Sequence, residues 1–251
     1  MEVINFIKDH TPRQIRLVSR RMKNYLAQVS DERLDLKSLF TRIYQEHSWA
    51  ENGAIVDPRR PFNSGPGSKG EAAERYVDCI NHFIAAQYIR SVVDLGCGDF
   101  RIGSRIARPE ISYVGVDIVE PLIQANQAQF GTGRVRFQCI DITRDELPAA
   151  ELCLIREVLQ HLSNAEAMAI LTKTRKYKRV IVTERWPGPQ GSFKANRDKP
   201  HGRAARFIWN SGLVLTEPPF NLKNVELFLD IRLPQAEFEG DTHMVSFLIT
   251  N

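Results

Sequence analysis

Short apolar runs alternate with longer amphipathic stretches through the middle of the chain. Five runs rich in β-branched and other apolar residues predict buried strands at 91–95, 113–116, 135–140, 152–155 and 179–183. Apolar residues at helical spacing predict helices between them, near 102–107, 121–130 and 165–174. This alternation is typical of a parallel sheet that is covered by helices on both faces.

The alternation stops after the fifth strand. Residues 186–223 form a long basic segment with several prolines and glycines, and two further strands are predicted at 225–231 and 244–250. No crossover helix is predicted between these two strands, so we expect them to form an antiparallel hairpin. The predicted fold is an α/β, doubly wound, mostly parallel seven-stranded sheet of Rossmann-like type that ends in this hairpin.

A helical extension is predicted before the sheet. Apolar residues recur at helical spacing over 15–29, 34–47 and 71–89. The first of these helices is basic and amphipathic, so it can lie on an anionic membrane or contact nucleic acid; packing against its own domain is the simpler interpretation. A polar loop rich in glycine and proline, 49–70, connects the second helix to the third.

Composition places the chain among ordinary globular proteins. It has 251 residues, 43% of them hydrophobic and 25% charged, and a net charge of +4. The four cysteines form no C-x-x-C pair, and Cys97, Cys139 and Cys153 are expected to be small buried apolar residues in a reducing compartment. The chain shows no signal peptide and no membrane-spanning apolar run, so a cytoplasmic location is predicted.

The first predicted strand runs into a glycine-rich turn, Asp94-Leu95-Gly96-Cys97-Gly98-Asp99, that is expected to open a helix. Glycines permit a sharp turn and a close approach to a ligand. The dinucleotide fingerprint requires a third glycine where this chain has Arg101, and Asp99 would repel a pyrophosphate. The turn therefore favours a cationic ligand over a dinucleotide.

Acidic residues follow the next two strands as well. Asp117 ends the second strand, where a carboxylate can accept hydrogen bonds from both hydroxyls of a ribose, and Asp141 ends the third. Each of these acids alone is compatible with a helix N-cap. Acids at three successive strand ends indicate one ligand site at the carboxyl edge of the sheet.

The residues after the fourth strand are the candidates for catalysis. Glu157 and His161 are four residues apart, so on a helix they would share one face. His161 is the candidate general base, because its ordinary pKa lies near 6.5; a packing role beneath the ligand is the alternative. No spacing typical of a metal site is present.

The turn Asp94–Gly98 resembles motif I of the class I S-adenosylmethionine-dependent methyltransferases. A longer set of motifs resembles a largely uncharacterised bacterial group of these enzymes, in which a Ser-Gly-x-Gly-Ser loop precedes motif I and many members sit among genes for glycan or natural-product assembly. The motifs are Trp49 with Glu51, Ser64–Ser68, Asp94–Phe100, Gly115–Val119, Asp141–Thr143 and Pro218–Asn221, and the resemblance covers roughly residues 45–230. One departure is Phe207-Ile208-Trp209-Asn210, where the group commonly has Gly-x-Trp-Arg.

The resemblance implies S-adenosyl-L-methionine as cofactor and an acid–adenine contact at Asp141. The expected cofactor-binding residues are Ser64, Gly65, Gly67, Ser68, Asp94, Gly96, Cys97, Gly98, Asp99, Asp117, Ile118, Asp141, Ile142 and Arg156. The expected catalytic residues are His161 and Glu157. For the acceptor we expect Trp49, Arg197, His201, Arg203, Trp209, Phe220 and Asn221, with Trp186 and Arg206 in the same segment. Residues 1–70 would form the extension and the cofactor-covering loop, 71–251 the methyltransferase domain, and 186–223 an acceptor-binding insertion.

O-methylation of a small-molecule or glycan acceptor is the predicted activity. Glu217-Pro218-Pro219-Phe220 resembles the motif of nucleic-acid amino-methyltransferases, but it lies after the fifth strand and begins with Glu, so no nucleic-acid substrate is expected. Two alternatives remain open: methylation of RNA or protein, favoured by the basic first helix, and a non-catalytic cofactor-binding scaffold.

Overall fold

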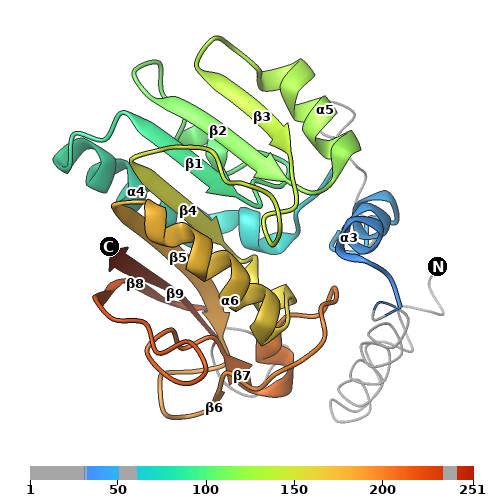
Figure 1. Cartoon of the computed structure of the whole chain (residues 1–251), viewed down its shortest axis with the longest axis vertical. Helices are drawn as coiled ribbons and strands as arrows, with labels where there is room; N and C mark the ends of the chain where they lie inside the picture. Colours follow the sequence, from blue (N-terminus) through green and yellow to red (C-terminus); the bar gives the residue numbers. More distant parts are fainter. Residues whose placement is uncertain (1–30, 32, 51–60, 234–241) are drawn as a thin grey trace.

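A single seven-stranded sheet forms the centre of the molecule (Figure 1). The structure is a computed structural model that describes residues 31, 33–50, 61–233 and 242–251. The strand order is β3-β2-β1-β4-β5-β9-β8. The strands are β1 Ser91–Leu95, β2 Ser112–Asp117, β3 Val135–Cys139, β4 Leu152–Arg156, β5 Arg179–Trp186, β8 Val225–Leu233 and β9 Thr242–Thr250. The first five are parallel, whereas β9 is antiparallel to both β5 and β8, so the predicted fold class and terminal hairpin are confirmed.

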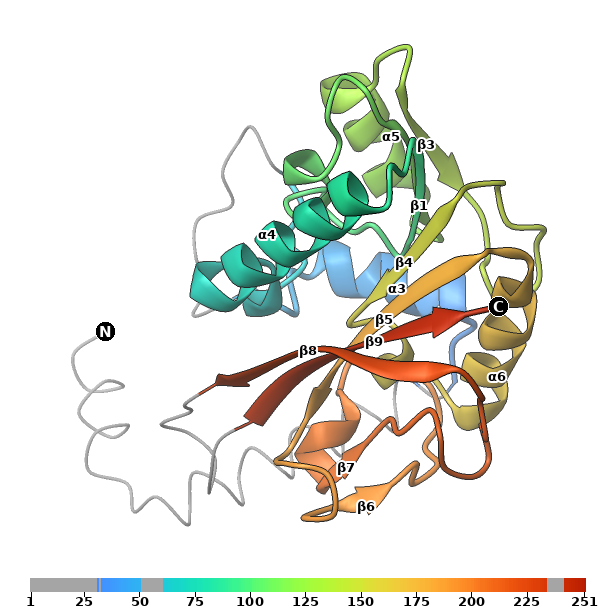
Figure 2. The same ribbon diagram turned by 90° about the vertical axis from the view of Figure 1, so that its left-hand side faces the viewer.

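Helices cover both faces of the sheet (Figure 2). On one face, α4 (Gly70–Ala86) packs its apolar residues against the side chains of Val92 and Leu154. On the other face, α6 (Asn164–Lys173) packs against Val93 and Cys153. Alternate residues of each strand enter opposite cores, as the period of two in a strand requires. The remaining helices are α3 (Leu36–Gln45) and α5 (Glu120–Phe130).

The helix predicted near 102–107 does not form, and this prediction is wrong. A series of turns and one 3-10 turn, Gly103–Arg105, connect β1 to β2. Phe100 has a φ of 58°, in the left-handed region that an α-helix excludes. Its ring packs edge-on against Tyr113 and Phe137, so core packing fixes a backbone that an α-helix cannot adopt.

Two further expectations need correction or lie outside the described residues. Cys139 is exposed, because it is the last residue of the edge strand β3, whereas Cys97 and Cys153 are buried as predicted. The predicted helix at 15–29 falls outside the described residues. Among the residues that the structure describes, no helix has both the length and the apolarity needed to cross a bilayer.

The segment 186–223 forms a small subdomain beside the hairpin (Figure 2). Two short parallel strands, β6 (Lys194–Ala195) and β7 (Ser211–Gly212), pair with each other, and a 3-10 helix covers Arg206–Trp209. Trp186 anchors the subdomain to the sheet, since its indole N–H donates to the carbonyl of Leu213 at 2.8 Å.

Candidate active site

The glycine turn after β1 lies at the carboxyl edge of the sheet. Gly96 and Gly98 have φ values of 81° and 55°, which glycine adopts without strain. A Cβ on Gly96 would lie 2.4 Å from a side-chain carbon of Val158, so the turn passes directly against the segment after β4. The N–H groups of Gly96 and Cys97 both donate to the carbonyl of Val116, at 2.8 and 2.9 Å.

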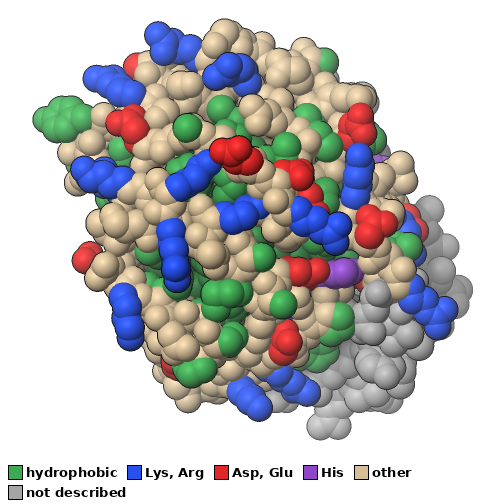
Figure 3. All heavy atoms as spheres, in the orientation of Figure 1, with side chains coloured by type: hydrophobic (Ala, Val, Ile, Leu, Met, Phe, Trp, Pro, Cys, Tyr) green, Lys and Arg blue, Asp and Glu red, His purple; other side chains and the backbone are tan. Residues whose placement is uncertain are grey.

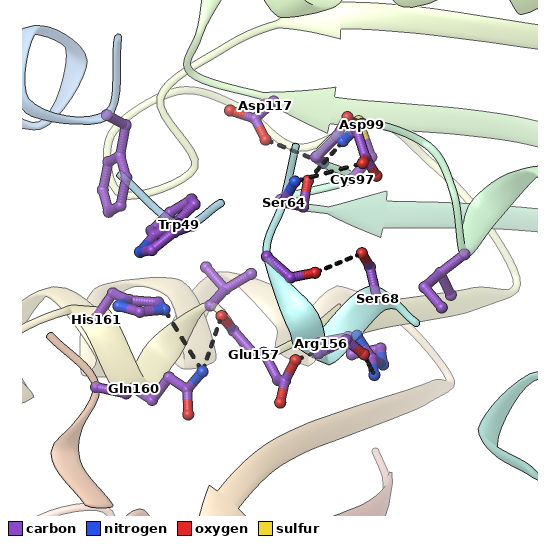
Figure 4. Close-up of a pocket in the computed structure, with 18 of the residues that line it drawn as sticks. Trp49, Ser64, Ser68, Cys97, Asp99, Asp117, Arg156, Glu157, Gln160 and His161 are labelled. Atoms are coloured by element: carbon purple, nitrogen blue, oxygen red, sulfur yellow. Dashed lines mark hydrogen bonds and ion pairs between the residues drawn. The ribbon is translucent and has the colours of Figure 1, made fainter. Parts of the chain in front are cut away.

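The loop at 64–68 sits on this turn. The hydroxyl of Ser64 accepts a hydrogen bond from the backbone N–H of Asp99 at 2.8 Å and lies 3.0 Å from the hydroxyl of Tyr44 (Figure 4). A Cβ on Gly98 would lie 2.3 Å from the same Ser64 oxygen. The contact therefore requires glycine at 98, and it places the loop at 64–68 against the glycine turn.

The strand-end carboxylates face one cavity. Asp117 accepts hydrogen bonds from the backbone N–H groups of Gly98 at 3.2 Å and Val119 at 3.1 Å. Burial raises the pKa of Asp117 to about 6, and burial likewise raises the pKa of Asp94 to about 6. Asp141 accepts from the N–H and the hydroxyl of Thr143, at 2.8 and 2.6 Å.

The cavity has a volume of about 800 Å³ and is built from segments across the chain. That size is within the range of ligand sites in proteins. All fourteen residues predicted to bind the cofactor line it, as do Glu157 and His161. Figure 4 shows Asp99 and Asp117 on one side of the pocket and Glu157, Gln160 and His161 on the other.

Glu157 lies between two arginines. Its Oε2 is 3.3 Å from Nη1 of Arg156, and its Oε1 is 3.2 Å from Nη2 of Arg185. Burial opposes its ionisation, but the two guanidinium groups outweigh burial and hold the pKa of Glu157 below its ordinary value. Glu157 has a φ of 54°, an uncommon conformation for a residue with a Cβ. A carboxylate held in this way is a weak base.

His161 lies on the 3-10 turn Leu159–His161, so it does not share an α-helical face with Glu157. Its ring centre is 5.2 Å from that of Trp49. Burial, with a smaller effect of the Lys199 charge, lowers the pKa of His161 to about 4. The imidazole is therefore neutral at pH 7 and retains a nitrogen lone pair that can accept a proton.

The buried carboxyl group of Glu184 supports the 3-10 turn that carries His161. Glu184 on β5 accepts hydrogen bonds from the backbone N–H groups of Leu159 and Gln160, at 2.9 and 3.0 Å. Burial raises the pKa of Glu184 to about 8. These bonds fix the position of the segment that carries His161.

Of the residues predicted for the acceptor, Trp49 and Arg203 line the cavity. The guanidinium group of Arg203 is engaged by the fully buried carboxylate of Asp31, at 2.9 and 3.0 Å. The other predicted residues do not line this cavity, namely Trp186, Arg197, His201, Arg206, Trp209, Phe220 and Asn221.

These seven residues have other surroundings. His201 is paired with Glu166 at 2.7 Å, and Phe220 is buried in the core. Arg206 is buried and donates to the carbonyls of Arg197 and Leu162. Most of these contacts reach outside segment 186–223, so its basic residues serve mainly to attach the segment to the rest of the protein.

Several cavity residues were not predicted from the sequence. They come from α3, α4, β5 and the 3-10 helix at 206–209, and are Phe40, Tyr44, Tyr76, Arg185, Phe207 and Ile208. Arg185 was missed because the fifth strand was expected to end at 183, whereas pairing with β9 extends it to Trp186.

Comparisons with known proteins agree with this geometry. Residues 92–179, from β1 to the start of β5, match a family described as a methyltransferase domain. No curated protein sequence matches the chain.

Solved structures share the fold. The 1,6-didemethyltoxoflavin-N1-methyltransferase of Burkholderia thailandensis, with bound 1,6-didemethyltoxoflavin and S-adenosylhomocysteine, has a TM-score of 0.52 and 19% identity over 86% of this chain and 88% of that one. The N-methyltransferase NodS of Bradyrhizobium japonicum, in complex with S-adenosylhomocysteine, has a TM-score of 0.52 and 13% identity over 83% of this chain and 98% of that one. The magnesium protoporphyrin IX methyltransferase of Synechocystis, with bound S-adenosylmethionine, has a TM-score of 0.50 and 16% identity over 86% of this chain and 98% of that one. The chain thus carries a methyltransferase domain with the class I fold.

Proposed function

We propose that this protein is an S-adenosylmethionine-dependent methyltransferase that transfers a methyl group to an oxygen atom of a small-molecule or sugar-type acceptor. The enzyme class and the cofactor follow from the methyltransferase-domain match and from the class I fold of the whole sheet. The choice of oxygen and the class of acceptor are inferences from the cavity.

The convergence of the glycine turn and the strand-end carboxylates in one cavity is the observation that carries this proposal. Each oxygen of Asp117 accepts one backbone hydrogen bond and keeps a further lone pair for a hydroxyl of a ribose. Ser64 and Asp99 lie where an amino-acid tail with an ammonium group would find acceptors. When bound, the sulfonium supplies an electrophilic methyl group.

His161 is the catalytic candidate in this proposal. Its neutral ring can accept a hydrogen bond from an acceptor hydroxyl, and the pKa of about 4 makes it a weak base, while Glu157 holds Arg156 and Arg185 in place. Trp49, Phe40 and Phe207 give that part of the cavity apolar walls, and such walls orient an acceptor beside a methyl group. Orientation alone accounts for much of the rate in a displacement of this kind.

Calorimetric titration with S-adenosylmethionine, S-adenosylhomocysteine and NAD tests the proposal. We expect binding of both methionine derivatives, no binding of NAD, and loss of binding in Asp117→Ala. Methyl transfer to RNA or to protein, with no transfer to any small molecule, would support the alternative substrate class. Binding of NAD alone would contradict the proposed function.

A further inference from the structure

Charge is distributed unevenly within the cavity. Four carboxylates belong to the part that contains the glycine turn, namely Asp94, Asp99, Asp117 and Asp141. The part that contains His161 carries a cluster of Arg156, Glu157 and Arg185, which we call the arginine cluster. The first part suits a cationic cofactor, whereas the arginine cluster has two positive charges and one negative charge.

The arginine cluster is largely removed from solvent. The side chains of Arg156, Glu157 and Arg185 are 9%, 13% and 14% exposed. A buried ionic cluster whose charges do not balance is unfavourable, because the attraction among its charges does not offset the free energy of removing them from water. An anionic group in the cavity would balance the surplus positive charge.

Of the two arginines, Arg185 has fewer partners, and its buried Nε has no hydrogen-bond partner among the described residues. Arg156 is also within electrostatic reach of Asp94, donates to the carbonyl of Gly67 at 2.5 Å and lies over the ring of Tyr76 at 5.0 Å. Arg156 is therefore integrated into the wall beneath the loop at 64–68. For Arg185, the carboxylate partner among the described residues is Glu157, which it shares with Arg156.

Arg185 also lies on the acceptor side of the cavity. Its guanidinium carbon is 5.6 Å from the ring centre of Phe207, which belongs to the 186–223 segment. Ile208 and Leu162 also line the cavity, so its wall includes apolar side chains. Arg203, the third arginine in the lining, is committed to Asp31.

We propose that Arg185 is a specificity-determining residue that binds a carboxylate group of the acceptor, and that the rest of the acceptor is aromatic or otherwise apolar. The planar guanidinium group matches a carboxylate geometrically, and stacking beside Phe207 orients it. This inference rests on the proposed methyltransferase function and names the substrate class for the same site.

Matched pairs of small carboxylic acids and their primary amides test this inference. An amide has nearly the shape of the acid and lacks its charge. Each pair is titrated against the protein saturated with S-adenosylhomocysteine, by ligand-observed NMR and then by calorimetry. We expect aromatic and apolar acids to bind about tenfold more tightly than their amides, which is the scale of one hydrogen-bonded charge pair.

Three variants separate the role of Arg185 from a general effect of charge. Arg185→Gln should bring the acid-to-amide ratio to within about twofold, and Arg185→Lys should retain part of the preference as a point charge. Arg136→Gln removes an exposed arginine on β3 and should leave the ratio unchanged. Thermal unfolding confirms that each variant is folded. The preference for acids over amides is measured on the parent protein itself, so that part of the test does not depend on any variant.

The same experiment identifies the other source of a carboxylate, the amino-acid tail of the cofactor. If Arg185→Gln weakens S-adenosylhomocysteine tenfold and the parent shows no acid preference, the anion belongs to the cofactor and the inference is overturned. Equal binding of acids and amides, or binding of neither, also overturns it while the proposed function stands. Failure of the parent to bind S-adenosylhomocysteine would overturn the proposed function itself.

Discussion

At the level of single residues, folding stability and cofactor binding favour opposite protonation states of Asp117. Burial raises its pKa to about 6, above the ordinary value of 3.8, so the folded protein takes up a proton there more readily than the unfolded chain. The contribution of Asp117 to the free energy of unfolding therefore falls as the pH rises from about 4 to about 6. Ribose hydroxyls, in contrast, require the ionised carboxylate as acceptor.

Cofactor affinity should therefore depend on pH in the opposite direction. We expect the affinity for S-adenosylhomocysteine to be constant above pH 7 and to fall below pH 6, approaching about tenfold per pH unit. Calorimetry between pH 8 and pH 5 measures this profile. Asp117→Asn should bind weakly with a flatter profile, which separates Asp117 from Asp94, whose pKa is also about 6. Equal affinity of the parent at pH 5 and pH 8 would contradict the prediction.

Gly67 provides a second prediction for a single residue. A Cβ at this position would lie 1.9 Å from Oε2 of Glu157, a carboxylate that two arginines hold in place. We expect Gly67→Ala to lower the free energy of unfolding by about 1–3 kcal/mol, the usual cost of forcing atoms into a packed site. It should also weaken cofactor binding, because the loop at 64–68 must move.

Gly133→Ala is the matched control for this substitution. A Cβ there has no neighbouring atom within 4 Å, so its effect on unfolding should stay within about 0.5 kcal/mol. Urea denaturation of both variants measures the difference. Equal stability of the two variants would show that Glu157 moves aside easily and is not fixed by the arginine cluster.

At the level of secondary-structure elements, the strands were predictable and the absence of a helix near 102–107 was not. Runs such as Ser91–Leu95 have the apolar, β-branched composition of a strand that is buried on both faces, and the hydrophobic pattern alone located them. Phe100 precedes the absent helix with a non-helical backbone, and its ring packs against Tyr113 and Phe137 from other strands. A contact between residues distant in sequence decides that backbone, so no local pattern reports it.

The same distinction applies to the site. The predicted cofactor residues from Asp94 to Arg156 lie at strand ends, and the carboxyl ends of parallel strands meet at one edge, so the sequence order placed them together. Most of the predicted acceptor residues lie on an irregular segment, where composition does not indicate which side chains face the cavity. His201 illustrates this, because it was expected to contact an acceptor and instead pairs with Glu166 away from the cavity.

The pair of Asp31 and Arg203 provides a prediction for α3. Asp31 precedes α3, and its side chain is fully buried between Arg203 and Arg42, whose closest contacts with it are 2.9 and 2.6 Å. Because α3 forms one wall of the cavity, this pair fastens that wall to the segment 186–223. Arg203→Gln should lower the free energy of unfolding by about 1–2 kcal/mol and increase amide hydrogen exchange in α3.

The effect of Arg203→Gln should also depend on pH. Burial opposes ionisation of Asp31, but its bonds to Arg203 lower the pKa below the ordinary 3.8. The stabilisation is present above about pH 4 and is lost as the pH falls through the pKa of the folded state. Lys37→Gln is the control on the same helix, because the pair of Lys37 with Glu120 is exposed and should contribute little. Unchanged exchange in α3 of Arg203→Gln would contradict the fastening role.

At the level of the whole molecule, the cavity joins parts of the chain that are far apart in sequence. Figure 3 shows charged side chains of both signs scattered over one face of the protein, with no extended single-sign patch on that face. The cavity walls come from α3, the loop at 64–68, the ends of β1, β2, β4 and β5, and the segment 203–208. The predicted boundary at residue 70 would cut through these walls, so we expect the extension and the sheet to act as one binding unit.

Cofactor binding should therefore stabilise the molecule as a whole. A ligand present at 100 times its dissociation constant adds about 2.7 kcal/mol to the free energy of unfolding. For a chain of this size, that corresponds to a rise of roughly 5–10 °C in the unfolding midpoint. Helix α3, which lies in the predicted extension, contacts the loop at 64–68 through the hydroxyl of Tyr44. Thermal unfolding should therefore remain a single transition, and the whole transition should shift to higher temperature. Differential scanning calorimetry with S-adenosylhomocysteine measures the shift, which NAD and Asp117→Ala should not produce. A second transition that stays at the original temperature would show that part of the chain unfolds independently of the site.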